Sequence, residues 1–121
     1  MKTPHPLPAL AAPAGPVDVL FVAGEHSGDA HAAAALRELR ERHPGVRVAA
    51  VGGQALAAAE AELLFDLTRY SVVGLVEVLR HYRFFAELMA ELVAWIEAHR
   101  PAVVCLVDYP GFNLRLAKRL G

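Results

Sequence analysis

Four short apolar runs along the chain have the character of β-strands that are covered on both faces. They are made of aliphatic and β-branched residues with little alternation between apolar and polar positions, which is the pattern of strands buried between two layers of helices. We therefore predict strands, the third of them brief, at residues 17–23, 46–51, 63–65 and 102–107.

The segments between these runs have apolar residues at steps of three and four, which is the spacing of the buried face of a helix. The longest stripe extends from Phe85 to Ile96, in a helix expected to end at Arg100. A last helix is expected to begin with Asn113 as its cap and to stop at Gly121. Further helices are predicted over residues 32–42 and 54–61.

Strands that alternate with helices require crossover connections, which produce a parallel sheet. The predicted fold class is α/β, a Rossmann-like parallel sheet flanked by helices. Such sheets have a crevice beyond the carboxyl ends of their strands, where the strand order reverses. We expect the reversal between the strands that end at Ala23 and Val107. The loops that follow them, GEHSGD at residues 24–29 and DYPGFN at residues 108–113, would then face each other.

The first of these loops carries two carboxylates on either side of a hydroxyl group. Glu25 and Asp29 flank Ser27, an arrangement suited to hydrogen bonding with hydroxyl-rich ligands, and the backbone amides near Gly28 could receive an anion. The loop has neither the third glycine of the dinucleotide fingerprint nor the lysine of a P-loop. The alternative is that Ser27 or Asp29 only caps the following helix.

The second loop begins with an acid in an apolar context. Asp108 directly follows five apolar residues. A charged side chain in such a context needs hydrogen-bonding or charged partners, or has a functional role, because desolvation disfavours the ionised form. A carboxylate placed in this way can act as a general base. The alternative is a turn residue ahead of Pro110 and Gly111. Tyr109 and Phe112 could stack on a sugar ring or simply pack the turn.

Composition limits the choice of partners. The 121 residues fit one domain, at 17–121, and the 12 basic and 13 acidic residues form no basic stripe for nucleic acid. The proline-rich residues 1–16 lack the apolar core of a signal peptide and predict a disordered cytoplasmic tail. The lone Cys105 predicts a buried thiol, and His26 and His31 are wrongly spaced to share a helix face around a metal.

Residues 71–85 combine an apolar stretch with a basic end. They are either core that other parts of a longer protein cover, or an interfacial surface that meets acyl chains while Arg80 and Arg83 approach phosphates. With so short a chain available as cover, the second interpretation is favoured. It assigns acyl-facing side chains to Leu75, Val76, Leu79 and Phe85.

Four segments together resemble one known family. The run VAGEHSGDAHAA at residues 22–33 resembles the first-strand signature of lipid-A-disaccharide synthases. Three further segments agree in order and spacing, and they are VGGQAL at 51–56, SVVGLVEVL at 71–79 and VDYPGFNLRLAKRLG at 107–121. The chain departs from the family at Ala32 and Glu60, where glycine is common, and at Leu56, where methionine is usual.

The resemblance implies the N-terminal, acceptor-side half of a GT-B glycosyltransferase. The family joins UDP-2,3-diacylglucosamine to 2,3-diacylglucosamine 1-phosphate (lipid X), with inversion, giving a β-1,6-linked disaccharide 1-phosphate and UDP, and needs no metal or other cofactor. On this basis Asp108 is the expected general base. Glu25 and Ser27 are expected to position the sugars, Asp29 to orient its loop, and Asn113 to hold the start of its helix.

The resemblance also implies a peripheral position on the cytoplasmic face of the bacterial inner membrane. The family's chains continue into a donor domain that is absent here, so we expect the isolated chain to be inactive. An oligomer is compatible with the sequence. Two other functions are considered: a non-catalytic, flavodoxin-like module for a small phosphorylated ligand, and a GT-B enzyme for another sugar nucleotide, although such enzymes use glycine-rich loops in place of GEHSGD.

Overall fold

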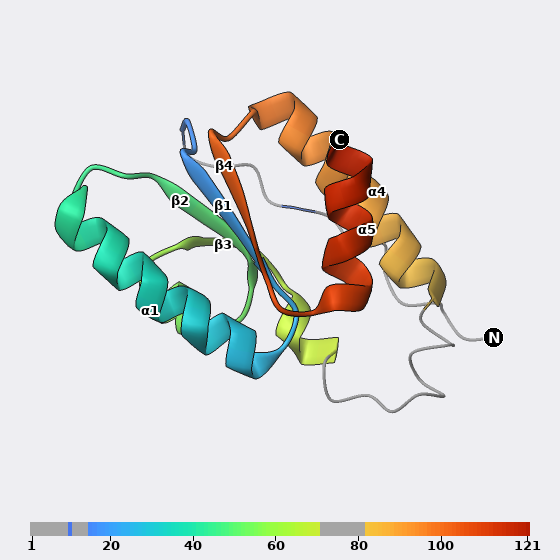
Figure 1. The fold of residues 1–121 in the computed structure, drawn as a ribbon, viewed down its shortest axis with the longest axis horizontal. Coiled ribbons are helices and arrows are strands. Elements are labelled where there is room, and N and C mark those ends of the chain that lie inside the picture. Colours follow the sequence, from blue (N-terminus) through green and yellow to red (C-terminus); the bar gives the residue numbers. More distant parts are fainter. Residues whose placement is uncertain (1–9, 11–14, 71–81) are drawn as a thin grey trace.

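The described part of the chain comprises residues 10, 15–70 and 82–121 of a computed structural model, and it forms a parallel sheet between two layers of helices (Figure 1). The elements follow in the order β1 (Val19–Ala23), α1 (His26–Arg42), β2 (Val48–Gly52), α2 (Gln54–Ala58), β3 (Glu62–Asp66), the 3₁₀ helix η1 (Leu67–Tyr70), α4 (Tyr82–His99), β4 (Val103–Val107) and α5 (Pro110–Leu120). All four predicted strands are present, and the predicted α/β fold class is confirmed.

The strand order is β3-β2-β1-β4, and every neighbouring pair is parallel. The chain therefore builds outward from β1 through β2 to β3, and then returns to place β4 on the other side of β1. Ala23 at the end of β1 pairs with Val107 at the end of β4. The predicted reversal of strand order between these two strands is confirmed.

The two faces of the sheet carry separate hydrophobic clusters. Alternate β1 residues divide between them, since Phe21 packs with α1 and α2, whereas Leu20 and Val22 pack with α4 and α5. Figure 1 shows α1 on one side of the strands and α4 with α5 on the other. The face of α1 that meets the sheet is formed by small residues and one leucine, namely Ala32, Ala33 and Leu36.

Three sequence predictions about these elements are corrected. The β4 side chains are half-buried rather than covered, and Val103 is 53% exposed, because β4 is the last strand on its side of the described sheet. Asn113 is not the cap of α5, which begins at Pro110 because proline is pre-organised for a first helical position. The helix predicted to reach Ala61 ends at Ala58, because Glu60 adopts a left-handed conformation with φ 70°.

Most of the predicted N-terminal tail and all of residues 71–81 lie outside the described residues, although Leu10 contacts the cluster beneath α4. Within the described residues, no helix has both the length and the apolar content that crossing a membrane requires.

Candidate functional site

The loops after β1 and β4 are in direct contact at the carboxyl edge of the sheet. A Cβ atom at Gly24 would lie 2.2 Å from the ring of Tyr109, and one at Gly28 would lie 3.5 Å from the Asp108 carboxylate oxygen Oδ2. The prediction that the two loops face each other across one crevice is therefore confirmed. Gly24 in particular is required, because any side chain there would displace Tyr109.

The turn at the end of β4 has an unusual backbone. Asp108 and Tyr109 are both left-handed, with φ values of 53° and 52°, and such conformations cost residues other than glycine roughly 1–3 kcal/mol each. Asn113 holds this turn in place. Its buried side-chain Nδ2 donates to Asp108 O at 2.8 Å, and Val22 O and Val107 O lie at 3.3 and 3.4 Å. One side chain thus joins the ends of β1 and β4 to the turn.

The Asp108 carboxylate lies at the surface, over the first turn of α1. Its side chain is exposed, so the prediction of an apolar environment for this acid is wrong. The reason is that Asp108 lies just beyond the end of β4, where the left-handed turn carries it out of the apolar layers. No side chain caps the N-terminus of α1, and the positive end of that helix dipole favours a negative charge at this position.

Asp29 occupies a buried position between the loops that follow β1 and β2. Its Oδ1 accepts hydrogen bonds from the backbone N–H groups of Gly53 and Leu56, at 2.8 and 3.2 Å, and its Oδ2 accepts one from Ala55 at 2.9 Å. The carboxylate therefore caps α2, and the alternative that it caps its own helix is wrong. A Cβ at Gly53 would approach Asp29 Oδ2 to 2.8 Å, so the close approach requires glycine there.

Glu25 and Ser27 are both exposed at the mouth of the crevice, with Glu25 as the residue that precedes α1. Glu25 lies close enough to Tyr109 to act on it electrostatically. Burial raises the pKa of the Tyr109 hydroxyl, and the negative charge of Glu25 raises it further. The rings of Tyr109 and Phe112 pack against each other with centroids 5.9 Å apart.

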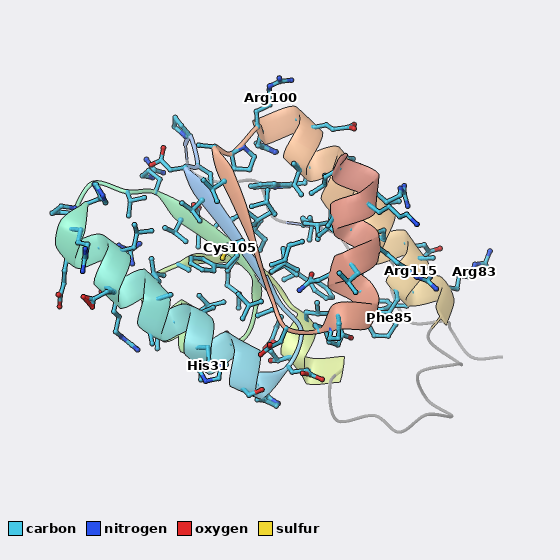
Figure 2. The ribbon with its side chains drawn as sticks, in the orientation of Figure 1. His31, Arg83, Phe85, Arg100, Cys105 and Arg115 are labelled. Carbon is cyan, nitrogen blue, oxygen red and sulfur yellow. The ribbon has the colours of Figure 1, made fainter. Side chains whose placement is uncertain are left out.

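A pocket of about 710 Å³ opens between α4 and α5, next to the crevice. Apolar side chains from both helices and the turn line it, together with Glu25 and three cations of α5; the principal members are Glu25, Phe85, Met89, Tyr109, Phe112, Arg115, Lys118 and Arg119. Figure 2 shows Arg115 and Phe85 between the two helices. The sequence interpretation did not identify the three cations, although their spacing along the helix was visible.

The remaining predicted site residues are placed as follows. Phe85 lines the pocket, whereas Arg83 points away from it in Figure 2, with a side chain that is 88% exposed and an ion-pair distance of 3.9 Å to Glu87. Leu75, Val76, Leu79 and Arg80 lie outside the described residues. Over the part of the chain that is described, no three His, Cys, Asp or Glu side chains converge as metal ligands would.

Comparison with known proteins gives one consistent result. A family model described as lipid-A-disaccharide synthetase matches residues 19–121. The lipid-A-disaccharide synthase of Nitrosococcus oceani is 50% identical over 101 residues, which cover 84% of this chain and 26% of the relative. That of Myxococcus xanthus is 45% identical over 105 residues, or 87% of this chain and 27% of the relative. Lipid-A-disaccharide synthase 1 of Legionella pneumophila strain Paris is 42% identical over 100 residues, or 83% and 26%. The chain thus spans about a quarter of the length of these curated relatives.

Proposed function

The chain belongs to the lipid-A-disaccharide synthetase family, and from this premise we propose that it forms the acceptor side of an inverting glycosyltransferase. The reaction transfers 2,3-diacylglucosamine from its UDP derivative to 2,3-diacylglucosamine 1-phosphate. The products are the β-1,6-linked disaccharide 1-phosphate and UDP. A second domain, which binds most of the nucleotide sugar, completes the enzyme.

One observation carries the proposal. The pairing of β1 with β4 brings the Asp108 carboxylate next to the first turn of α1. Its Oδ2 atom lies 3.5 Å from the position that a Cβ atom would take at Gly28. The same pairing puts Glu25 at the mouth of an apolar pocket. A carboxylate that is exposed at the crevice and held in place by the Asn113 hydrogen bond to its turn can accept a proton from a sugar hydroxyl, which is the role of a general base.

In the proposed mechanism Asp108 accepts the proton of the acceptor 6-hydroxyl. The acceptor oxygen attacks the anomeric carbon of the donor from the face opposite UDP, the bond from that carbon to the UDP oxygen breaks, and the configuration inverts. The proton stays on Asp108 until solvent removes it. Glu25 and Ser27 hold sugar hydroxyls by hydrogen bonds, while Asp29 and Asn113 act indirectly, by fixing the two loops.

The proposal includes a peripheral position on the cytoplasmic face of the inner membrane, because the acylated substrates reside in a bilayer. Support comes from the α5 surface beside the pocket. Leu114 is 70% exposed there, next to Arg115, and such a mixture of apolar and cationic side chains suits the interface of an anionic membrane.

The general base is tested in a chimera in which this chain replaces the matching segment of the Nitrosococcus oceani synthase. Asp108→Asn should lower turnover by about two to four orders of magnitude, with acceptor binding little changed, because the amide cannot accept the proton. Glu41→Gln, an exposed acid on α1 away from the crevice, is the matched control and should retain full turnover. Equal turnover in the two variants would show that Asp108 is only a turn residue.

A further inference from the structure

Three cations lie on one face of α5, and no ion pair among the described residues involves them. Lys118 and Arg119 lie three and four residues after Arg115, which places all three on the same side of the helix. All three are exposed, and the two ion pairs found among the described residues, Glu38 with Arg42 and Arg83 with Glu87, do not involve them. Their mutual repulsion falls when an anion binds between them.

The simplest explanation of these cations is the helix dipole, which favours basic residues in the last turn. That explanation covers Lys118 and Arg119. It does not cover Arg115, which lies in the middle of α5, lines the pocket, and is on the side of α5 next to α4 in Figure 2. The position of Arg115 therefore points to a ligand.

The floor beneath these cations is apolar. Phe85 and Met89 of α4 and Phe112 of α5 line it, and Met89 and Phe112 are largely buried. The volume of about 710 Å³ falls in the range of roughly 300–1,000 Å³ that is usual for small-molecule sites. An apolar floor beneath a cationic rim suits an amphiphilic anion better than a fully polar ligand.

The charges are ordered along the pocket. Glu25 and Tyr109 lie at the crevice end, and Arg115 is six residues further along α5, or about 9 Å at the rise of a helix. A ligand that presents a hydroxyl group to the crevice and a separate phosphate further along α5 matches this order. The acceptor sugar carries both groups, because its 6-hydroxyl and 1-phosphate extend from the two ring carbons that flank the ring oxygen.

We propose that the pocket between α4 and α5 is the acceptor site, in which the acyl chains of the sugar phosphate lie on the Phe85, Met89 and Phe112 floor and its phosphate is bound by Arg115, Lys118 and Arg119. This inference rests on the proposed function for the identity of the ligand. The residues that make up the site follow from the cavity and its charges alone.

The test is calorimetric titration of the chain with a short-chain 2,3-diacylglucosamine 1-phosphate kept below its micelle concentration. The same lipid without phosphate, and glucosamine 1-phosphate without acyl chains, are titrated in parallel. We expect the intact amphiphile to bind at least about tenfold more tightly than either, because a charge-assisted contact or a buried acyl group is each worth a tenfold factor or more.

Two variants with matched controls locate the binding. The double variant Arg115→Gln and Arg119→Gln should lose about tenfold in affinity for the phosphorylated lipid and almost none for the unphosphorylated one, whereas Arg37→Gln on α1 should change neither. Ala86→Trp, which fills the pocket from an exposed position on α4, should weaken both lipids, whereas Ala94→Trp, exposed on the same helix outside the pocket, should weaken neither.

The proposal is overturned if the double variant changes the affinity for the phosphorylated and the unphosphorylated lipid by the same factor. It is also overturned if glucosamine 1-phosphate binds as tightly as the lipid, or if the chain binds only phosphatidylglycerol vesicles and no monomeric lipid. Failure of the proposed function gives a different pattern. If pocket variants leave lipid affinity unchanged while Asp108→Asn still abolishes disaccharide synthesis in the chimera, only the pocket assignment is wrong. If the chimera makes no disaccharide while the variants weaken lipid binding as expected, the pocket assignment stands alone.

Discussion

Removing the Asp29 carboxylate should destabilise the whole chain, because this one side chain joins two loops through three backbone amides. The bonds from Gly53 and Leu56 are buried, and the bond from Ala55 is partly buried. In Asp29→Ala all three N–H groups lose their acceptor. A buried donor left without a partner costs about 1–3 kcal/mol, and the partly buried one recovers some of this loss from water.

These values give a loss of about 3–5 kcal/mol in the free energy of unfolding, of which the two buried amides contribute most. A chain of this length has a total stability of roughly 5–15 kcal/mol, so the variant should lose a large share of it. Asp29→Asn separates the loss of the hydrogen bond from Ala55 from the loss of the bonds from Gly53 and Leu56. Its amide oxygen keeps the bonds from Gly53 and Leu56, while its NH₂ group faces the N–H of Ala55, and the loss should be about 1–2 kcal/mol.

Urea unfolding followed by circular dichroism measures the free energy of unfolding of each variant. We expect it to be highest for wild type, lower for Asp29→Asn and lowest for Asp29→Ala. Glu41→Ala, an exposed acid on the same helix, should stay within about 0.5 kcal/mol of wild type. Native-state hydrogen exchange adds a local measurement, since the amides of Gly53, Ala55 and Leu56 should exchange faster in Asp29→Ala. If Asp29→Ala bound acceptor poorly but unfolded like wild type, Asp29 would be a ligand contact and the structural argument would fail.

Three further predictions concern the backbone at Glu60 and the ionisable side chains of Tyr109 and Cys105. Glu60→Gly should stabilise the chain by about 1 kcal/mol in urea unfolding, because the left-handed conformation of Glu60 costs an L-residue roughly 1–2 kcal/mol, and Glu60→Ala should give no such gain. Burial and Glu25 raise the pKa of Tyr109 above its ordinary 10.0, so its contribution to stability is fully present below about pH 10 and is lost as the pH rises through the folded-state value. Tyr109→Phe should therefore flatten the decline in stability on the alkaline side, and an unchanged slope would contradict this. Burial also raises the pKa of Cys105 above 9.0, so the thiol should react with a disulfide reagent more slowly in the folded chain than in urea, and equal rates would refute its protection.

The sequence predicted the architecture well because the features that determine it are local. Apolar runs and helical stripes mark the elements, and the handedness of crossovers then leaves few ways to arrange them. The juxtaposition of residues 24–29 and 108–113 followed from the crevice that parallel sheets have beyond the carboxyl ends of their strands, where the strand order reverses, and the structure confirms it. The exposure of β4 could not be predicted in the same way, because periodicity reports on the faces of a strand and not on whether another strand lies beside it.

The site was less predictable because its contacts join distant parts of the chain. The carboxylate of Asp29 was assigned to a cap or a ligand, and its actual partners belong to a helix 24 to 27 residues further on. The three α5 cations carried a visible helical spacing. Their meaning depended on the apolar surface of α4 beside them, which no pattern within α5 reveals.

The turn at Asp108 and Tyr109 gives an independent physical reason to regard this edge of the sheet as functional. A sequence selected only for stability would place glycine at these two left-handed positions, since glycine adopts them without steric cost. The chain instead keeps glycine at positions 24 and 28, where it makes room for the two side chains, and uses the buried Asn113 to hold the turn against its strain. Each of these features serves to fix a carboxylate and an aromatic ring at the crevice. Because backbone strain of this kind persists only where the surroundings enforce it, the arrangement is better explained by a requirement for those two side chains than by the needs of folding.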